Sequence, residues 1–357
     1  MKKVGIYIHI PFCRAKCYYC DFISYVNKDH LIIEYIDRLE KEMALYTEAM
    51  EDYKITTIFI GGGTPSILEG RQINRIINCL YKHFKVDNKI EISIEANPGI
   101  LDRQKLMDYL NSGVNRLSIG LQACQNHLLK QIGRIHKYED FINNLRDARR
   151  AGFSNINVDL IFALPNQTLQ DWRACLRNVS QLEIPHISTY SLIVEEGTLF
   201  QRWLATGKIK RVDEDIELAM YEEGISFLEG KNYNHYEISN FARKGFKCQH
   251  NINYWKNGEY LGLGLGAHSH MGKSRFNNYT GMSKYLELVD KGKKPISDKI
   301  NLSYNDQVSE TMFMGLRMME GISVDDFQNS FGKSPWEIYG CRLEKLKNKK
   351  MLQYNKN

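Results

Sequence analysis

Hydrophobic and polar positions follow two alternating patterns over the first 195 residues. Short apolar runs, typical of buried strands, occupy residues 4–10, 55–60, 90–94, 116–121, 156–162 and 187–194. Between them, apolar residues spaced three and four apart predict helices at roughly 30–50, 71–84, 102–112, 138–151 and 168–181. Strands that alternate with helices favour a parallel sheet, and six such units predict an α/β fold, an incomplete (β/α)6 barrel over residues 1–195.

The pattern changes after residue 195. A helix is predicted over 213–228, and the following chain has β-type and aromatic-rich character, with YNHYEISNFARKGFKCQHNINYW and the glycine-rich YLGLGLGAHSH. We interpret 196–299 as a β-rich extension of the barrel. From residue 300, amphipathic segments at 305–319, 324–330 and 336–347 predict a small helical C-terminal domain of the winged-helix type, residues 300–357.

Composition excludes several classes of protein. The 357 residues include 48 Lys and Arg against 42 Asp and Glu, and this mild, dispersed charge of +6 does not indicate a nucleic-acid partner. No apolar run approaches the ~18 residues of a membrane span. The N-terminus lacks the apolar core and cleavage site of a secretory signal. We therefore expect a cytoplasmic protein, in which clustered cysteines serve as metal ligands or catalysts rather than disulfides.

Three of the eight cysteines form the strongest chemical signal. Cys13, Cys17 and Cys20 make a C-x3-C-x2-C triplet directly after the first predicted strand. Three thiolates can hold three irons of a [4Fe-4S] cluster and leave the fourth iron open. The alternative is structural zinc, which needs a fourth protein ligand, and the candidates Cys248 and His250 lie far along the chain. The spacing favours the cluster.

A run of glycines follows the second predicted strand. Gly61, Gly62 and Gly63 precede Thr64 and Pro65. Glycines let a backbone approach a ligand closely because no Cβ stands in the way. A plain turn between strand and helix has the same signature. Next to an open iron on the same rim, we interpret the run as a loop that binds the amino group of an amino-acid-like ligand.

Polar residues end three further strands. Glu95, Gln122 and Asp159 lie where the runs at 90–94, 116–121 and 156–162 finish or turn polar. Such groups need a partner when buried, and ligand hydroxyls or amines would supply one. Each is also explicable by a neighbouring strand or helix end, but three on one rim favour a ligand. Arg134 is a fixed cation suited to pairing a carboxylate.

Together the motifs YIHIPFCRAKCYYCDF, GGGTPS, EANP and SIGLQ resemble the radical S-adenosylmethionine (SAM) superfamily, in its branch of oxygen-independent coproporphyrinogen III oxidases and HemW-type haem chaperones. The resemblance spans nearly the whole chain. It implies a radical SAM barrel in which SAM binds the open iron and is cleaved by one electron from the cluster to methionine and a 5′-deoxyadenosyl radical. An electron donor to the cluster is an implied partner. The resemblance also implies positions for SAM: Tyr7 and the backbone at Tyr19 would border it, Gly62, Gly63 and Thr64 would hold its amine, Arg134 its carboxylate, and Glu95, Gln122 and Asp159 would surround its ribose and sulfonium.

Three features favour a chaperone over an oxidase within that branch. The oxidases resemble a C-x3-C-x2-C-x-C pattern, and Phe22 stands at the position of its fourth cysteine. Only twelve residues precede Cys13, fewer than the oxidases use around their substrate. The segment from His250 to Trp255 matches the HNxxYW motif of the chaperones. The resemblance implies haem as the ligand and haem-accepting proteins, some at the membrane, as partners. An enzyme that oxidatively decarboxylates the propionates of a tetrapyrrole, an oxidoreductase, is the alternative.

His250 is the candidate haem ligand. Imidazole is the usual axial ligand of haem iron, and Tyr254 and Trp255 offer flat apolar surface for a macrocycle. A histidine and aromatics packed in the core have the same signature. Other groups in this region that can reach an iron are His235, His268, His270 and Cys248. The family's C-terminal domain continues beyond the position of Leu352, so we expect this chain to be shorter than its relatives there.

Overall fold

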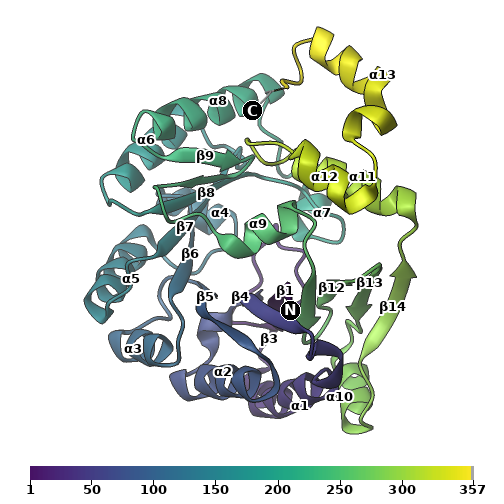
Figure 1. The fold of residues 1–357 in the computed structure, drawn as a ribbon. Helices are drawn as coiled ribbons and strands as arrows, with labels where there is room; N and C mark the ends of the chain where they lie inside the picture. The colour runs from purple at the N-terminus through teal and green to yellow at the C-terminus, as the bar shows by residue number, and fades with distance from the viewer. Residues whose placement is uncertain (355–357) are drawn as a thin grey trace.

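The computed structural model describes residues 1–354 and contains a twelve-stranded sheet in the order β14-β13-β12-β11-β1-β4-β5-β6-β7-β8-β10-β9 (Figure 1). Six neighbouring strands of this sheet run parallel, as the apolar runs predict. They are β1 (Lys2–Ile10), β4 (Tyr53–Gly62), β5 (Val86–Ala96), β6 (Arg116–Gln122), β7 (Ile156–Phe162) and β8 (His186–Ser191). The sheet of the described residues is open, so the incomplete barrel is confirmed.

The five helices predicted between these strands form within a few residues of the expected positions. They lie around the outside of the curved sheet (Figure 1): α1 (Ile32–Leu45), α2 (Gly70–His83), α3 (Arg103–Asn111), α5 (Tyr138–Ala151) and α6 (Leu169–Ser180). Local sequence sets their ends. Thr168 caps α6 by accepting a hydrogen bond from the Asp171 N–H, and Gly152 ends α5 at φ 118°. Further helices are α4 (Asn126–Gln131), α7 (Leu199–Ala205), α8 (Glu214–Glu229) and α10 (Met282–Asp290).

The chain after residue 195 extends both edges of the same sheet. Strand β11 (Tyr260–Leu263) pairs with β1 in parallel, and β12 (His268–Met271), β13 (Ser274–Asn278) and β14 (Ile296–Asn301) follow as an antiparallel series. At the other edge, β10 (Asn240–Ala242) and β9 (Asn234–Glu237) continue from β8. A division of the chain at residues 195 and 299 stays a prediction.

One part of the prediction for this region is wrong. Residues 249–255, expected to have β character, form the helix α9 (Gln249–Trp255). In Figure 1, α9 lies in the middle of the view, enclosed by the strands on the face that α1, α2 and α3 do not cover. The reason is tertiary: Glu91 on β5 accepts hydrogen bonds from the backbone N–H groups of Gln249 and His250, which start the helix.

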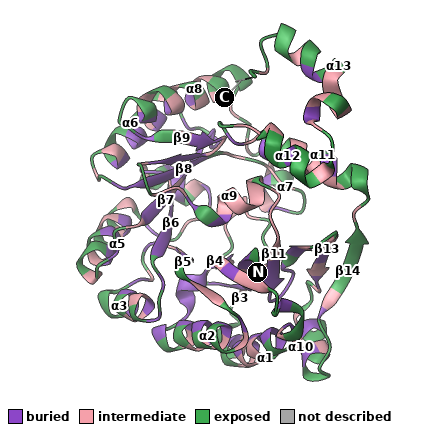
Figure 2. Ribbon diagram, viewed as in Figure 1, coloured by how far each residue is buried: buried purple, intermediate pink, exposed green. Residues whose placement is uncertain are grey.

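The C-terminal region is helical, as predicted. It consists of α11 (Tyr304–Gly315), α12 (Val324–Phe331) and α13 (Pro335–Asn348). Residues 355–357, the end of the predicted C-terminal domain, lie outside the described residues. None of the helices described is both long and apolar enough to cross a bilayer. Figure 2 shows the buried residues concentrated in the strands, while the outer helices expose one face. The strands thus form a rigid frame for side chains at their ends.

Candidate functional site

A cavity of about 420 Å³ opens at the carboxyl ends of the parallel strands. This is the end at which parallel α/β sheets bind ligands. The structure brings eleven of the thirteen predicted site residues to this cavity: Cys13, Cys17, Cys20, Tyr19, Gly62, Gly63, Thr64, Glu95, Gln122, Arg134 and Asp159. Their convergence makes the cavity the candidate site for both the cluster and SAM. The individual roles stay predictions.

The three cysteines line the cavity without converging on one point. A short sheet of β2 (Phe12–Cys13) and β3 (Tyr25–Val26) holds the loop between them. In residues 1–354, no three His, Cys, Asp or Glu side chains are grouped as a single ion would need. A [4Fe-4S] cluster binds each thiolate through a different iron, so thiols spread around a cavity fit it. Thr64 Oγ1 lies 3.3 Å from the Cys13 sulfur, beside this site.

The glycine loop passes so close to its neighbours that side chains are excluded. A Cβ on Gly63 would stand 2.7 Å from the Phe12 carbonyl oxygen. Gly62 has φ +110°, and a Cβ there would meet the His9 ring at 2.5 Å. The Gly62 N–H donates to Glu95 Oε2 at 3.1 Å. The loop therefore presents backbone rather than side chains to the cavity, as the interpretation of a ligand-binding loop requires.

Two carboxyl groups face the cavity with raised pKa values. Burial, and secondarily the charge of Asp159, raises the pKa of Glu95 to about 8. Burial also raises the pKa of Asp159, although hydrogen bonds from Ser118 at 2.9 Å and Asn157 at 2.8 Å oppose the shift. Both carboxyls are positioned to accept hydrogen bonds from ligand hydroxyl or amine groups, which would favour their charged forms.

Arg134 retains a free donor beside the cluster site. Its Nη2 donates to Asn97 Oδ1 at 2.7 Å and to the Gly120 carbonyl at 2.5 Å, and its Nη1 donates to the Cys17 sulfur at 3.5 Å. Its buried Nε has no partner among the described residues. A buried guanidinium donor without a partner is costly, so a ligand carboxylate at this position fits the residues present.

Sequence reasoning missed several residues that line the cavity, among them Asn97, Ser118 and Gly120. Asn97, which lines the cavity, donates to Thr64 Oγ1 at 3.0 Å and accepts from Arg134. Ser118 lines the cavity, and a Cβ on Gly120 would stand 2.8 Å from Gln122 Nε2. Each lies two or four positions from a predicted site residue on the same strand or its end. Because side chains alternate along a strand, this spacing was the available signal.

Tyr7 and His250 do not line the cavity. The Tyr7 hydroxyl lies 3.0 Å from His9 Nδ1. His250 is 1% exposed, with Nδ1 2.9 Å from Thr57 Oγ1 and Nε2 3.0 Å from the Tyr254 hydroxyl. Burial, helped by the charge of Arg116, lowers the pKa of His250 to about 3. Both ring nitrogens are occupied, so this conformation offers no nitrogen of His250 to an iron.

The rival haem ligands differ in accessibility. His235 stacks on Phe241 with ring centroids 4.4 Å apart, and its Nε2 lies 3.2 Å from the Ile238 carbonyl. His270 is buried, whereas His268 is exposed. Cys248 is fully buried, and burial raises the pKa of its thiol to about 12. His268 is thus the most accessible of these four side chains.

Comparison with known proteins gives consistent matches. The radical SAM superfamily model matches residues 7–179, and the HemN C-terminal domain model matches residues 302–357. The chain is 38% identical to heme chaperone HemW of Lactococcus lactis, covering 99% of this chain and 92% of that protein, and 37% identical to heme chaperone HemW of Bacillus subtilis, covering 97% and 92%. Coproporphyrinogen III oxidase (HemN) from Escherichia coli, a radical SAM enzyme, superposes with a TM-score of 0.83 at 25% identity, covering 97% and 82%.

Proposed function

The chain belongs to the haem chaperone HemW family of the radical SAM superfamily, and from this premise we propose that it binds haem through the α9 region and transfers it to haem-dependent proteins. The observation that carries the proposal is the match over 99% of the chain to a heme chaperone, together with a cavity that all three cysteines of the motif line. A [4Fe-4S] cluster and SAM are its further cofactors. When bound, the cluster supplies an electron to SAM.

The residues of the cavity would hold these groups as follows. Cys13, Cys17 and Cys20 ligate the cluster. The Gly62–Gly63 backbone and Thr64 take the methionyl amine of SAM. Arg134, whose Nε lacks a partner, takes its carboxylate through a charge-assisted hydrogen bond. Glu95 and Asp159 accept from its hydroxyl groups, and Gln122 and Tyr19 border it. The ligand is thereby oriented before any electron moves.

Haem requires a change at α9, because His250 Nε2 points at Tyr254 in the present conformation. We propose His250 as the axial ligand after α9 moves away from the sheet, with Tyr254 and Trp255 flanking the macrocycle. Partners are haem, haem-accepting proteins, some of them at the membrane, and an electron donor to the cluster. The proposed location is the cytoplasm.

The test is a haem titration of the full chain after anaerobic reconstitution of the cluster. We expect a Soret band from stoichiometric haem, and His250→Ala shifts that band and weakens haem retention because the iron loses a nitrogen donor. His127→Ala, an exposed histidine on α4, is the matched control. Iron and sulfide content stay unchanged in both variants.

Three results would overturn parts of this account. Absence of haem binding by the wild type with an intact cluster contradicts the chaperone. Conversion of coproporphyrinogen III to a vinyl product with consumption of SAM would favour the oxidase, which the structural likeness to HemN keeps as the second candidate. An unchanged spectrum in His250→Ala, with loss in His268→Ala, would keep the chaperone and move the ligand.

A further inference from the structure

A continuous chain of hydrogen bonds crosses the interior of the barrel from the cavity to α9. The Cys248 backbone N–H donates to the Tyr236 hydroxyl at 3.3 Å, and that hydroxyl lies 2.8 Å from His186 Nε2. His186 Nδ1 lies 2.6 Å from Asn157 Oδ1, and Asn157 Nδ2 donates to Asp159 Oδ1 at 2.8 Å. We call these five residues the polar chain. It begins immediately before α9 and ends on a carboxylate that lines the cavity.

The direction of every bond in the polar chain is determined. Asn157 Nδ2 also donates to Ser118, and Ser188 donates to Asn157 Oδ1, so the amide orientation of Asn157 is set from both sides. His186 Nδ1 must then carry the proton that Asn157 Oδ1 accepts. Burial, followed by the nearby charge of Arg116, lowers the pKa of His186, so the ring is neutral and Nε2 accepts from Tyr236.

All donors therefore point from α9 toward Asp159. Tyr236, His186 and Asn157 are at most 2% exposed, so solvent does not compete for these bonds. Aligned hydrogen bonds polarise one another in a low-dielectric interior, and the negative end of the polar chain strengthens each bond behind it. A ligand hydroxyl that donates to Asp159 shares that charge and weakens the series.

The first bond of the polar chain, from the Cys248 N–H to the Tyr236 hydroxyl, is one of the ties that keep α9 in place. The others at this end come from Glu91, which accepts from the backbone N–H groups of Gln249 and His250. We propose that the polar chain couples the two sites, with His186 and Tyr236 as positioning residues through which a SAM hydroxyl at Asp159 loosens α9 and eases haem access to His250. The part of this inference that concerns haem binding rests on the proposed function.

The experiment measures the coupling directly. Haem affinity of the reconstituted protein is determined with and without SAM, and SAM affinity with and without haem. We expect SAM to raise haem affinity about two- to tenfold, the range of one neutral hydrogen bond. Haem raises SAM affinity by the same factor, because linkage is reciprocal. Tyr236→Phe, which removes only the hydroxyl, brings both factors close to one.

Tyr233→Phe is the matched control. Tyr233 is 3% exposed and donates to the Ile184 carbonyl, outside the polar chain. It therefore loses a comparable buried hydrogen bond but keeps the coupling. His186→Gln is a second interruption of the polar chain, and melting curves establish that each variant is folded. A coupling that survives in both Tyr236→Phe and His186→Gln, or that is absent in the wild type, would overturn the inference.

A readout without haem separates this inference from the proposed function. Amide hydrogen exchange of residues 249–255 is followed with and without SAM. We expect faster exchange with SAM in the wild type and in Tyr233→Phe, and no change in Tyr236→Phe. If the wild type binds no haem but shows this SAM response, the chaperone proposal fails and the coupling stands. If haem binds but SAM does not change the exchange rate, the coupling is contradicted and the chaperone proposal stands.

Discussion

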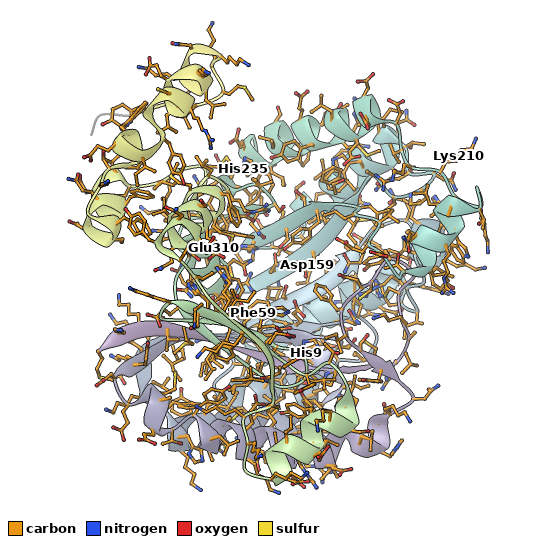
Figure 3. The ribbon with its side chains drawn as sticks, turned by 90° about the vertical axis from the view of Figure 1, so that its right-hand side faces the viewer. His9, Phe59, Asp159, Lys210, His235 and Glu310 are labelled. Atoms are coloured by element: carbon orange, nitrogen blue, oxygen red, sulfur yellow. The ribbon has the colours of Figure 1, made fainter. Side chains whose placement is uncertain are left out.

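The two ends of the barrel interior contrast in how ready they are for a ligand. At the carboxyl ends of the strands, the cavity is open and Arg134 keeps a donor without a partner. Thr57 lies on β4 about five residues before Gly62, toward the amino end of the strand. It contacts His250, and both nitrogens of that ring already have hydrogen-bond partners. In Figure 3, Asp159 and Phe59 lie in the middle of the molecule, whereas Glu310 lies toward the C-terminal helices.

The difference shows that the cavity is preformed and the α9 region is closed. Several contacts hold the far end of α9: the Arg317 guanidinium lies 4.4 Å from the Trp255 ring centroid, and Asn257 donates to Thr311 on α11 at 3.1 Å. A ligand of the cavity needs no rearrangement, but a ligand of His250 must first bear the cost of opening α9. The apparent affinity for that ligand is its intrinsic affinity multiplied by the fraction of protein in which α9 is open.

The cluster ligands give the strongest test of this contrast. Cys17→Ser removes one of three thiolate ligands, and we expect loss of most of the roughly four irons per chain and of the thiolate-to-iron absorption band. Haem binding at α9 persists, because that region shares no residue with the cavity lining. Cys341→Ser, at an exposed cysteine on α13, is the control. Full iron loading of a variant lacking all three cysteines would contradict the assignment.

The next effect concerns SAM. Arg134→Ala removes a charge-assisted partner worth roughly 1.5–3 kcal/mol, so SAM affinity should fall ~10- to 100-fold in equilibrium binding, with the cluster retained. Arg146→Ala, on the exposed face of α5, should bind SAM as the wild type does. Equal affinities in the two folded, iron-loaded variants would exclude Arg134 from the site.

A smaller effect tests the closure of α9. Glu91→Ala removes the acceptor of the Gln249 and His250 N–H groups, and we expect a loss of about 1–3 kcal/mol of stability with faster haem association. Glu91→Gln keeps an acceptor without the charge, so its stability and its rate of haem association should lie between those of the wild type and Glu91→Ala. Stopped-flow mixing with haem measures the rate. A slower association in Glu91→Ala would mean that the closed form of α9 is the one that binds.

A further effect is a pH dependence of opposite sign at the two ends. Glu95 has a pKa of about 8, above its unfolded value, so its contribution to stability is lost as pH rises from about 4.5 to 8. His250 has a pKa of about 3, below its unfolded value, so its contribution is lost as pH falls from about 6.5 to 3. Melting temperatures are measured across this pH range. The curve of melting temperature against pH should be flatter on its alkaline side in Glu95→Gln and flatter on its acid side in His250→Gln. Unchanged slopes on these two sides would contradict these shifts.

The six parallel strands, five of their helices and most of the cavity could be predicted from the sequence. This follows because strand and helix periodicity are local, and because the ends of parallel strands must meet at one edge. Cys13 and Gly63 could thus be assigned to one rim from the sequence, and the motifs supplied the family. Asn97 was quoted in EANP, but its bonds to Thr64 and Arg134 depend on tertiary distances.

The closed state of α9 depends on contacts that form only in the folded protein. Its seven residues have no strong helical period, and the helix begins where Glu91, distant in sequence, accepts its first N–H groups. The burial of His250 against Thr57 and the polar chain from Cys248 to Asp159 likewise join residues from separate strands. Such contacts depend on which side chains face inward across the sheet, and the pattern along one segment does not contain that information.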